Sequence, residues 1–248
     1  KAMKLAKKIK GAMVYPSTII AVAIIVTVVL LLYVIPIFGK MFQDFGQALP
    51  APTMLVLGLS AFTRKYFLLV IVAVAVLVAI FRWYRKQEQG RKVTDALLLK
   101  LPVVGSLLQR IAVARFARTL GTMVSSGVPI LESMDIVAKS AGNKIIEDAI
   151  ISARMSISEG KTIADPLAEA KVFPVMVTQM VAVGEATGAL DTMLNKIADF
   201  YDEEVDSAVE ALTALLEPML MVFLGVVIGG LVVAMYLPIF KLAGVVGG

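Results

Sequence analysis

Three long apolar segments constrain the fold of this chain more than any other feature. Residues 11–39 and 218–240 carry no charged side chain, and each is long enough to cross the ~30 Å apolar layer of a bilayer as a helix. A third run, residues 66–81, reaches across only if its basic flanks extend toward the headgroups and Trp83 lies at the interface. The alternative for this shorter run is a buried core helix. We expect a span, because aromatic and basic residues flank this run.

The composition fits this interpretation. Hydrophobic residues make up 59% of the 248 residues, and the mean hydropathy is +0.87, which is too apolar for an ordinary soluble domain. The chain has no Cys and no His, which excludes disulfides, Cys/His zinc sites, and thiol or imidazole catalysis within it.

Basic residues indicate how the spans are oriented. Five Lys lie in the first ten residues and five Lys or Arg in residues 82–92, whereas residues 40–65 hold three and the C-terminal tail only Lys241. Loops rich in Lys and Arg stay in the cytoplasm. We therefore expect this order along the chain: a basic tail (1–13), a first span (14–39), a periplasmic loop (40–63), a second span (64–84), a cytoplasmic connector (85–111), a cytoplasmic helical bundle (112–212), a third span (213–240) and a periplasmic tail (241–248).

Turn signals at short intervals divide the predicted bundle into about six helices. They are Gly127 with Pro129, Gly142 with Asn143, Gly160, Pro174 and Gly188, which are typical helix stops and starts. Thr162 and Asp165 have the spacing of a capping arrangement for a short fourth helix. Apolar residues then recur every three or four positions from Leu190 into the third span, so the sixth helix should enter that span without a break. The fold class is all-α: three transmembrane helices and a cytoplasmic helical bundle.

One pattern occurs twice. Pro16 stands twenty residues before Pro36, Pro218 stands twenty residues before Pro238, and each second proline begins Pro-Ile-Phe. If the repeat is real, each copy is a helical domain followed by a span. The alternative is chance within biased apolar sequence. We expect a first helical domain to precede this chain, with residues 1–13 as its basic end.

Three motifs of the sequence resemble those of a known protein family. The turn Ser-Gly-Val-Pro (126–129), the motif Gly184-Glu185-x-x-Gly188 and the pair Glu217-Pro218 are similar to the second half of the inner-membrane platform protein of type IV pilus and type II secretion machines. The resemblance covers essentially the whole chain. It implies two cytoplasmic domains and three spans. We expect no cofactor and no catalytic residue, because no positioned acid, base or nucleophile accompanies the polar motifs. The implied partners are a cytoplasmic assembly or retraction ATPase, pilin or pseudopilin subunits, other inner-membrane machine components and further copies of the protein.

Two polar features are candidates for contact with a partner or for a structural role. Glu185, between Gly184 and Gly188, either contacts a partner or bonds the backbone amides at the start of a neighbouring helix. The acidic segment 199–210, with Asp202, Glu203, Glu204 and Asp206, is either a docking strip for a basic partner or a solvated helix face. Whether a metal binds this segment stays open.

Charge is divided along the middle of the chain. Residues 82–118 hold nine Lys or Arg and two acids, which indicates a basic collar facing anionic headgroups. We expect no nucleic-acid binding, because these basic residues crowd a membrane boundary.

Within the third span, Gly225, Gly229 and Gly230 form a small-residue face that would let another helix approach, between Pro218 and Pro238. The alternative is local flexibility.

The sequence disfavours three other functions. "EGKT" at 159–162 resembles the end of a phosphate-binding loop, but the required earlier glycine is Met155 and no strand precedes it. A small transporter or channel subunit would need charged or strongly polar residues within its spans, and the three apolar segments have none. A membrane-anchored enzyme would need a catalytic constellation of residues, which the sequence also lacks. The predicted function is a non-enzymatic inner-membrane platform that couples the ATPase to pilin-like subunits. The residues do not decide between pilus and secretion use.

Overall fold

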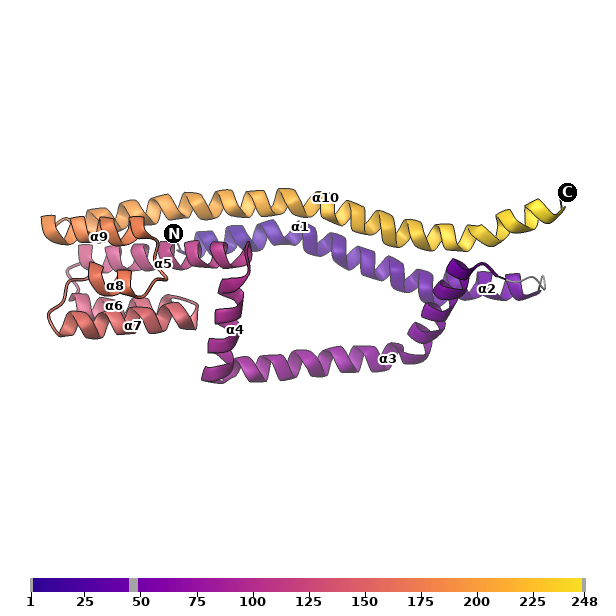
Figure 1. Ribbon diagram of the computed structural model, residues 1–248, viewed down its shortest axis with the longest axis horizontal. Helices are drawn as coiled ribbons and strands as arrows, with labels where there is room; N and C mark the ends of the chain where they lie inside the picture. The colour runs from indigo at the N-terminus through magenta and orange to yellow at the C-terminus, as the bar shows by residue number, and fades with distance from the viewer. Residues whose placement is uncertain (1, 45–48, 247–248) are drawn as a thin grey trace. The chain divides into compact units, whose positions relative to one another are not determined.

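The protein is described by a computed structural model that covers the backbone of residues 2–44 and 49–246 and the side chains of residues 11, 13–41 and 49–240. It divides into two compact units. The first contains Lys1–Ile9 and Phe81–Ala211, and the second contains Lys10–Ile80 and Leu212–Gly248. Within the described residues every regular element is helical, so the expected all-α fold is confirmed (Figure 1).

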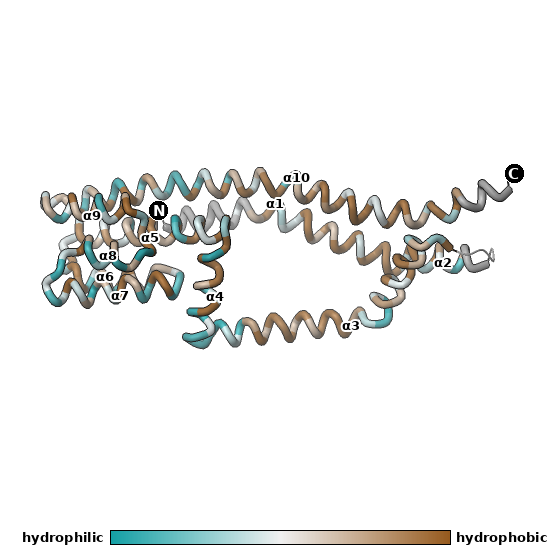
Figure 2. Tube along the Cα trace, viewed as in Figure 1, coloured by the Kyte–Doolittle hydropathy of each residue, from teal (hydrophilic) through white to brown (hydrophobic). Residues whose placement is uncertain are grey.

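The second unit holds the apolar segments. It contains most of α1 (Ala2–Val29), the π-helical turn η1 (Leu30–Val34), α2 (Ile35–Asp44), α3 (Ala51–Lys86) up to Ile80, and the C-terminal part of α10 (Leu190–Val246) from Leu212. Three stretches are long and apolar enough to cross a membrane: Met13–Met41, Ala51–Lys86 and Leu190–Phe240. Figure 2 shows hydrophobic colouring along α3 and along the coloured parts of α1 and of the second half of α10.

The first unit holds the bundle. Its helices are α4 (Glu88–Lys100), α5 (Val104–Ser125), α6 (Ile130–Ser140), α7 (Lys144–Ser158), α8 (Ala164–Glu169), α9 (Val175–Thr187) and the first part of α10. The core forms around α5, where Phe116 is fully buried and its ring lies 4.8 Å from that of Phe173. Leu194 and Ile197 of α10 belong to the same buried cluster. Because these residues are distant in sequence, their burial ties α5, α8–α9 and α10 into one body.

Helix ends in this unit follow the local signals in the sequence. Asn143 accepts hydrogen bonds from the amides of Ile145 and Ile146 and so caps α7. At the end of α9, Gly188 adopts a φ of 71°, and the next amide reaches back to the Gly184 carbonyl at 2.9 Å. This left-handed turn favours glycine because it has no Cβ. Thr162 donates to Asp165 at 2.6 Å, as the predicted capping pair would.

Two segments differ from their expected form. The predicted loop at 40–63 contains the end of α2 and, from Ala51, the start of α3, so most of its described residues are helical. The predicted connector at 85–111 contains all of α4 and the first turns of α5. The stretch of the first unit that holds the bundle, Phe81–Ala211, also includes this connector, whereas the bundle was expected from residue 112. The reason is that α4 packs on α7 through contacts distant in sequence. The backbone of residues 2–13 of the predicted basic tail belongs to α1, and that of residues 241–246 of the predicted C-terminal tail belongs to α10. The side chains of residues 1–10 and 241–248 lie outside the described residues.

Candidate functional site

The Gly184-Glu185-x-x-Gly188 motif lies where α8, α9 and α10 meet. Gly184 is buried, and a Cβ added there would lie 3.0 Å from the Cα of Leu190 and 3.1 Å from the side chain of Met193. Glycine at this position therefore allows α9 and the start of α10 to approach closely. Gly188 supplies the left-handed turn between the two helices.

Glu185 faces the start of α8. Its two carboxylate oxygens each accept a hydrogen bond from the amide of Ile163 at 2.9 Å, and one lies 3.4 Å from the amide of Ala164. The first amides of a helix have no partner within the helix, and a carboxylate there is favourable. This geometry supports bracing of α8, the structural alternative for Glu185, and leaves both oxygens engaged within the chain.

The acidic segment of α10 is partly neutralised by α5. Arg118 pairs with Asp202 at 2.8 Å and with Asp199 at 2.5 Å, and Arg110 pairs with Glu204 at 3.1 Å. Burial by itself lowers the pKa of Arg118, but its hydrogen bonds to the two aspartates outweigh burial and raise it. Asp202 and Glu204 thus hold α10 to α5.

Other positions of this segment face outward. Glu203 and Ser207 are exposed, and Phe200 is 45% exposed. The three residues follow one another at intervals of about one helical turn, so they share one face of α10. Asp206 is half-buried and has an interaction of its own within the chain. A docking strip on α10 would therefore centre on Glu203 rather than on all four predicted acids.

A charged centre that the sequence interpretation missed joins α4 to α7. The Asp95 side chain is buried, its carboxylate accepts the amide of Lys144 at 2.8 Å, and it also receives Arg85 at 3.0 Å. The side-chain amide of Asn143 donates to the Asp95 backbone carbonyl at 3.4 Å. Asp95 thus satisfies a free amide at the start of α7. One signal pointed to it, since Asp95 is one of only two acids in the basic run 82–118.

The same region holds a network around Lys144. Its ammonium pairs with Glu147 at 2.9 Å, with Asp148 at 3.2 Å and with Glu88 at 3.3 Å, while Lys92 reaches Asp148 at 3.0 Å. Hydrogen bonds to Glu147 and Asp148 raise the pKa of Lys144. For Asp148, burial acts to raise the pKa, but the bonds from Lys92 and Lys144 outweigh it and the pKa is lowered. Some basic residues of the predicted collar, such as Lys92, therefore form ion pairs with acids of the same chain.

In both Pro-Ile-Phe repeats, a hydroxyl from α3 donates to the backbone carbonyl that the proline leaves without an amide partner. The first case is Pro36. In the π-helical turn, the amide of Ile35 reaches back five residues to the carbonyl of Leu30. In that register the Leu31 carbonyl would take the amide of residue 36, which proline lacks. The hydroxyl of Ser60, from α3, donates to the Leu31 carbonyl instead.

Pro238 repeats this arrangement. In an α-helix its amide would bond the carbonyl four residues earlier, which is that of Ala234. The hydroxyl of Thr53, also from α3, donates to the Ala234 carbonyl at 2.5 Å. Thr53 and Ser60 are both buried and stand seven residues apart, about two turns, on one face of α3. We call these two contacts the proline latches.

Apolar packing surrounds the latches. Leu31 and Ile35 form a buried cluster with Leu231 and Met235 of α10, and Val56 and Leu57 of α3 pack against it. The latches thus lie in an apolar three-helix contact, where an unpaired carbonyl is costly.

The membrane-length part of α10 presents two further surfaces. A Cβ added at Gly225, Gly229 or Gly230 would meet no other atom within 4 Å, so this face is open and its predicted helix-packing role stays a prediction. Pro218 and Pro238 both lie inside the continuous helix. An apolar groove of about 190 Å³ runs between α1 and α10, lined by side chains such as Ile20, Ile24 and Phe223.

Among the described residues, no group of three or more His, Cys, Asp or Glu is placed to hold a metal ion. The class defined by these features is a helical protein in which a charged bundle continues into helices of membrane-spanning length.

Comparison with known proteins narrows this class. Residues 116–238 match the family described as type II secretion system protein F. The chain is 58% identical over 243 residues to the type IV pilus assembly protein PilC of Myxococcus xanthus, covering 98% of this chain and 58% of that protein. It is 44% identical over 248 residues to PilC of Pseudomonas aeruginosa, covering 100% and 66%. It is 33% identical over 241 residues to the type II secretion system protein F of the same species, covering 97% and 60%.

The chain belongs to this family of pilus-assembly and secretion-system platform proteins, as the resemblance predicted. It spans between 58% and 66% of the length of these three relatives. The family and the three apolar helices together indicate a protein of the inner membrane.

Proposed function

We propose that this chain is the membrane-proximal part of a platform that couples a cytoplasmic assembly ATPase to pilin or pseudopilin subunits in the inner membrane. The names of its relatives support a place in a pilus-assembly or secretion machine. The bundle faces the cytoplasm in this proposal, since the basic residues favour that side. The described residues provide binding surfaces and helix contacts, and the platform acts without chemistry of its own.

The continuity of α10 carries the proposal. This helix runs from Leu190 to Val246 without interruption (Figure 1). Leu194, Ile197 and Val205 in its first part are fully buried, whereas residues 218–240 carry no charge. A displacement of the bundle by an ATPase would therefore pass along hydrogen-bonded backbone into the apolar segment. A flexible linker at this point would dissipate it.

The surfaces left open suit the two kinds of partner. On α10, Glu203 with Phe200 offers a mixed acidic and apolar patch to a cytoplasmic protein. The glycine face at Gly225 and Gly229, and the apolar groove beside Phe223, are surfaces on which an apolar helix of a pilin subunit would pack. The same glycine face would also serve contacts between copies of the platform.

The test is a pair of insertions of equal length between Ala211 and Leu212, in the full-length protein in its host. Four alanines add ~6 Å and a little more than one helical turn but keep the helix. Gly-Ser-Gly-Ser adds the same length and removes its stiffness. At matched membrane abundance, we expect the alanine insertion to retain more pilus or secretion activity than the flexible one. Equal activity of the two variants would contradict transmission through α10.

A further inference from the structure

Helix α4 exposes large apolar side chains that a helix of a water-soluble bundle would bury. The side facing the bundle carries charges next to Leu99, which packs against the bundle core. On this side Asp95 caps α7, and Arg91 pairs with Glu147 at 3.4 Å. The opposite side is apolar and open. Val93 is 57% exposed and Leu97 is 64% exposed.

The exposed apolar residues form a continuous line. Residues four apart lie on one side of a helix, so Val93 and Leu97 share a face that points away from Asp95. In the turn that follows, Leu101, Val103 and Val104 are all more than 40% exposed and extend the line. Surface helices of soluble domains place such a stripe against the core. An outward stripe indicates that the medium or partner outside α4 is apolar.

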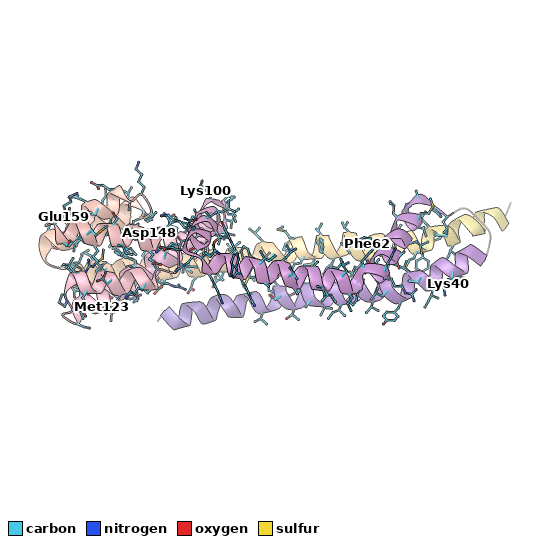
Figure 3. The ribbon with its side chains drawn as sticks, turned by 90° about the horizontal axis from the view of Figure 1, so that it is seen from below. Lys40, Phe62, Lys100, Met123, Asp148 and Glu159 are labelled. Carbon is cyan, nitrogen blue, oxygen red and sulfur yellow. The ribbon has the colours of Figure 1, made fainter. Side chains whose placement is uncertain are left out.

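The neighbouring residues indicate which medium this is. Helix α3, of membrane-spanning length, ends at Lys86, and a single residue separates it from α4. Trp83 is 64% exposed, and the exposed basic residues Lys86 and Lys100 stand at the two ends of α4. Figure 3 labels Lys100, at the C-terminal end of α4, and Asp148, on α7 within the bundle. The axes of α4 and α5 differ by 110°, so α4 runs across the direction of the bundle's central helix.

We propose that α4 and the turn at 101–104 form a membrane-surface helix that binds the anionic phospholipids of the leaflet into which α3 emerges. The apolar line enters the boundary between headgroups and acyl chains, and Lys86 and Lys100 contact the phosphates. The inference rests on the placement of α3 in the membrane proposed above, and it adds a lipid contact to the platform. With Asp95 and Arg91 holding the other face, α4 fixes the bundle against the bilayer.

A lipid surface fits better than a protein partner for two reasons. The flanking Lys86 and Lys100 complement anionic headgroups, and the one acid at the start of α4, Glu88, pairs with Lys144 at 3.3 Å. The stripe also continues directly from a helix of spanning length. A second copy of the chain or another protein domain would bury the same stripe without contact with lipid. The experiment separates these cases.

The experiment places an environment-sensitive NBD fluorophore on single cysteines, because this chain contains none. The variants are Leu97→Cys on α4, Trp83→Cys at the end of α3, and Met155→Cys on α7, a site that is 52% exposed and serves as the matched control. The full-length protein is reconstituted in nanodiscs of phosphatidylcholine with phosphatidylglycerol. Quenching by spin-labelled lipids and by an aqueous quencher is compared.

We expect lipid-borne quenching several times stronger at 97 than at 155, close to that at 83. Equal quenching at 97 and 155, with strong quenching at 83, would overturn the lipid contact and leave the membrane placement of α3 intact. Weak lipid quenching at 83 as well would instead reject that placement. Protection of 97 from both quenchers would show burial by protein and would also overturn the proposal.

A charge variant tests the headgroup contact separately. Lys86→Gln with Lys100→Gln should reduce lipid quenching at 97, and the reduction should vanish in phosphatidylcholine alone, because only anionic lipids attract the two charges. Lys139→Gln on α6, away from α4 in the chain, is the control. The same quenching for wild type and the charge variant in both lipids would contradict phosphate recognition.

Discussion

The proline latches offer the sharpest test of how the apolar helices hold together. Replacing Thr53 by Val keeps the shape of the side chain and removes the hydroxyl that donates to the Ala234 carbonyl. Replacing Pro238 by Ala restores an amide that bonds the same carbonyl within α10. If the Thr53 hydroxyl compensates for the amide that Pro238 lacks, Thr53→Val should lower the free energy of unfolding only in a protein that still carries Pro238.

The magnitude follows from the setting of the contact. Thr53 is 6% exposed and its hydroxyl lies 2.5 Å from the carbonyl. Interhelical hydrogen bonds in membrane proteins contribute ~0.6 kcal/mol on average and up to ~1.7 kcal/mol. We expect Thr53→Val to cost about 1 kcal/mol in the free energy of unfolding, and to cost close to nothing in the Pro238→Ala background. The coupling energy between the two positions is then also about 1 kcal/mol.

The assay is detergent-induced unfolding of the full-length protein for the wild type, both single variants and the double variant. Thr18→Val is the matched control, because the Thr18 hydroxyl donates to Val14 within its own helix and joins no other. Ser60→Ala with Pro36→Ala forms a second cycle for the other latch. Additive effects in both cycles, with a coupling energy near zero, would refute the link between the hydroxyls and the prolines.

Three further predictions concern the bundle. Glu185→Ala should lower its stability by about 0.5–2 kcal/mol, because two amides of α8 lose their acceptor, and an unchanged melting temperature would contradict the brace. The pKa of Asp148 is lowered from 3.8, so its contribution is present above that value and is lost as the pH falls through the lowered pKa. Melting temperature should therefore fall less steeply below pH 4 in Asp148→Asn than in the wild type, and parallel pH profiles would reject the contribution. Glu203→Gln should leave the melting temperature unchanged and weaken binding of a basic partner most at low salt, whereas Asp202→Asn should destabilise the bundle by about 1 kcal/mol through Arg118. Equal melting temperatures of these two variants would contradict the division of the acidic segment.

Features set by nearby residues could be predicted from the sequence. The helix ends at Gly188 and Asn143 appear where their residue types indicated, because a left-handed turn and an amide cap are decided within a few residues. The presence of three apolar helices followed in the same way from uninterrupted hydropathy, whereas the start of α3 at Ala51, within the predicted loop 40–63, did not.

Features set by distant residues could not be predicted. Asp95 caps a helix that begins 49 residues later, and Thr53 reaches a carbonyl 181 residues away. The proline repeat was visible in the sequence, but the hydroxyls that compensate for it lie in a helix between the two copies. Asp202 and Glu204 likewise read as a uniform acidic face until their pairing with α5 divided it.

The central claim is that one surface of the platform receives an ATPase while another holds a pilin-like subunit. Site-specific photo-cross-linking in cells tests it directly, with the reactive residue at Phe200 on the bundle part of α10 or at Phe223 in the apolar groove, and cross-linked partners identified by mass spectrometry. We predict the assembly ATPase at 200 and pilin or pseudopilin at 223. Recovery of neither protein at either position, from cells that assemble pili or secrete normally, would contradict the coupling role.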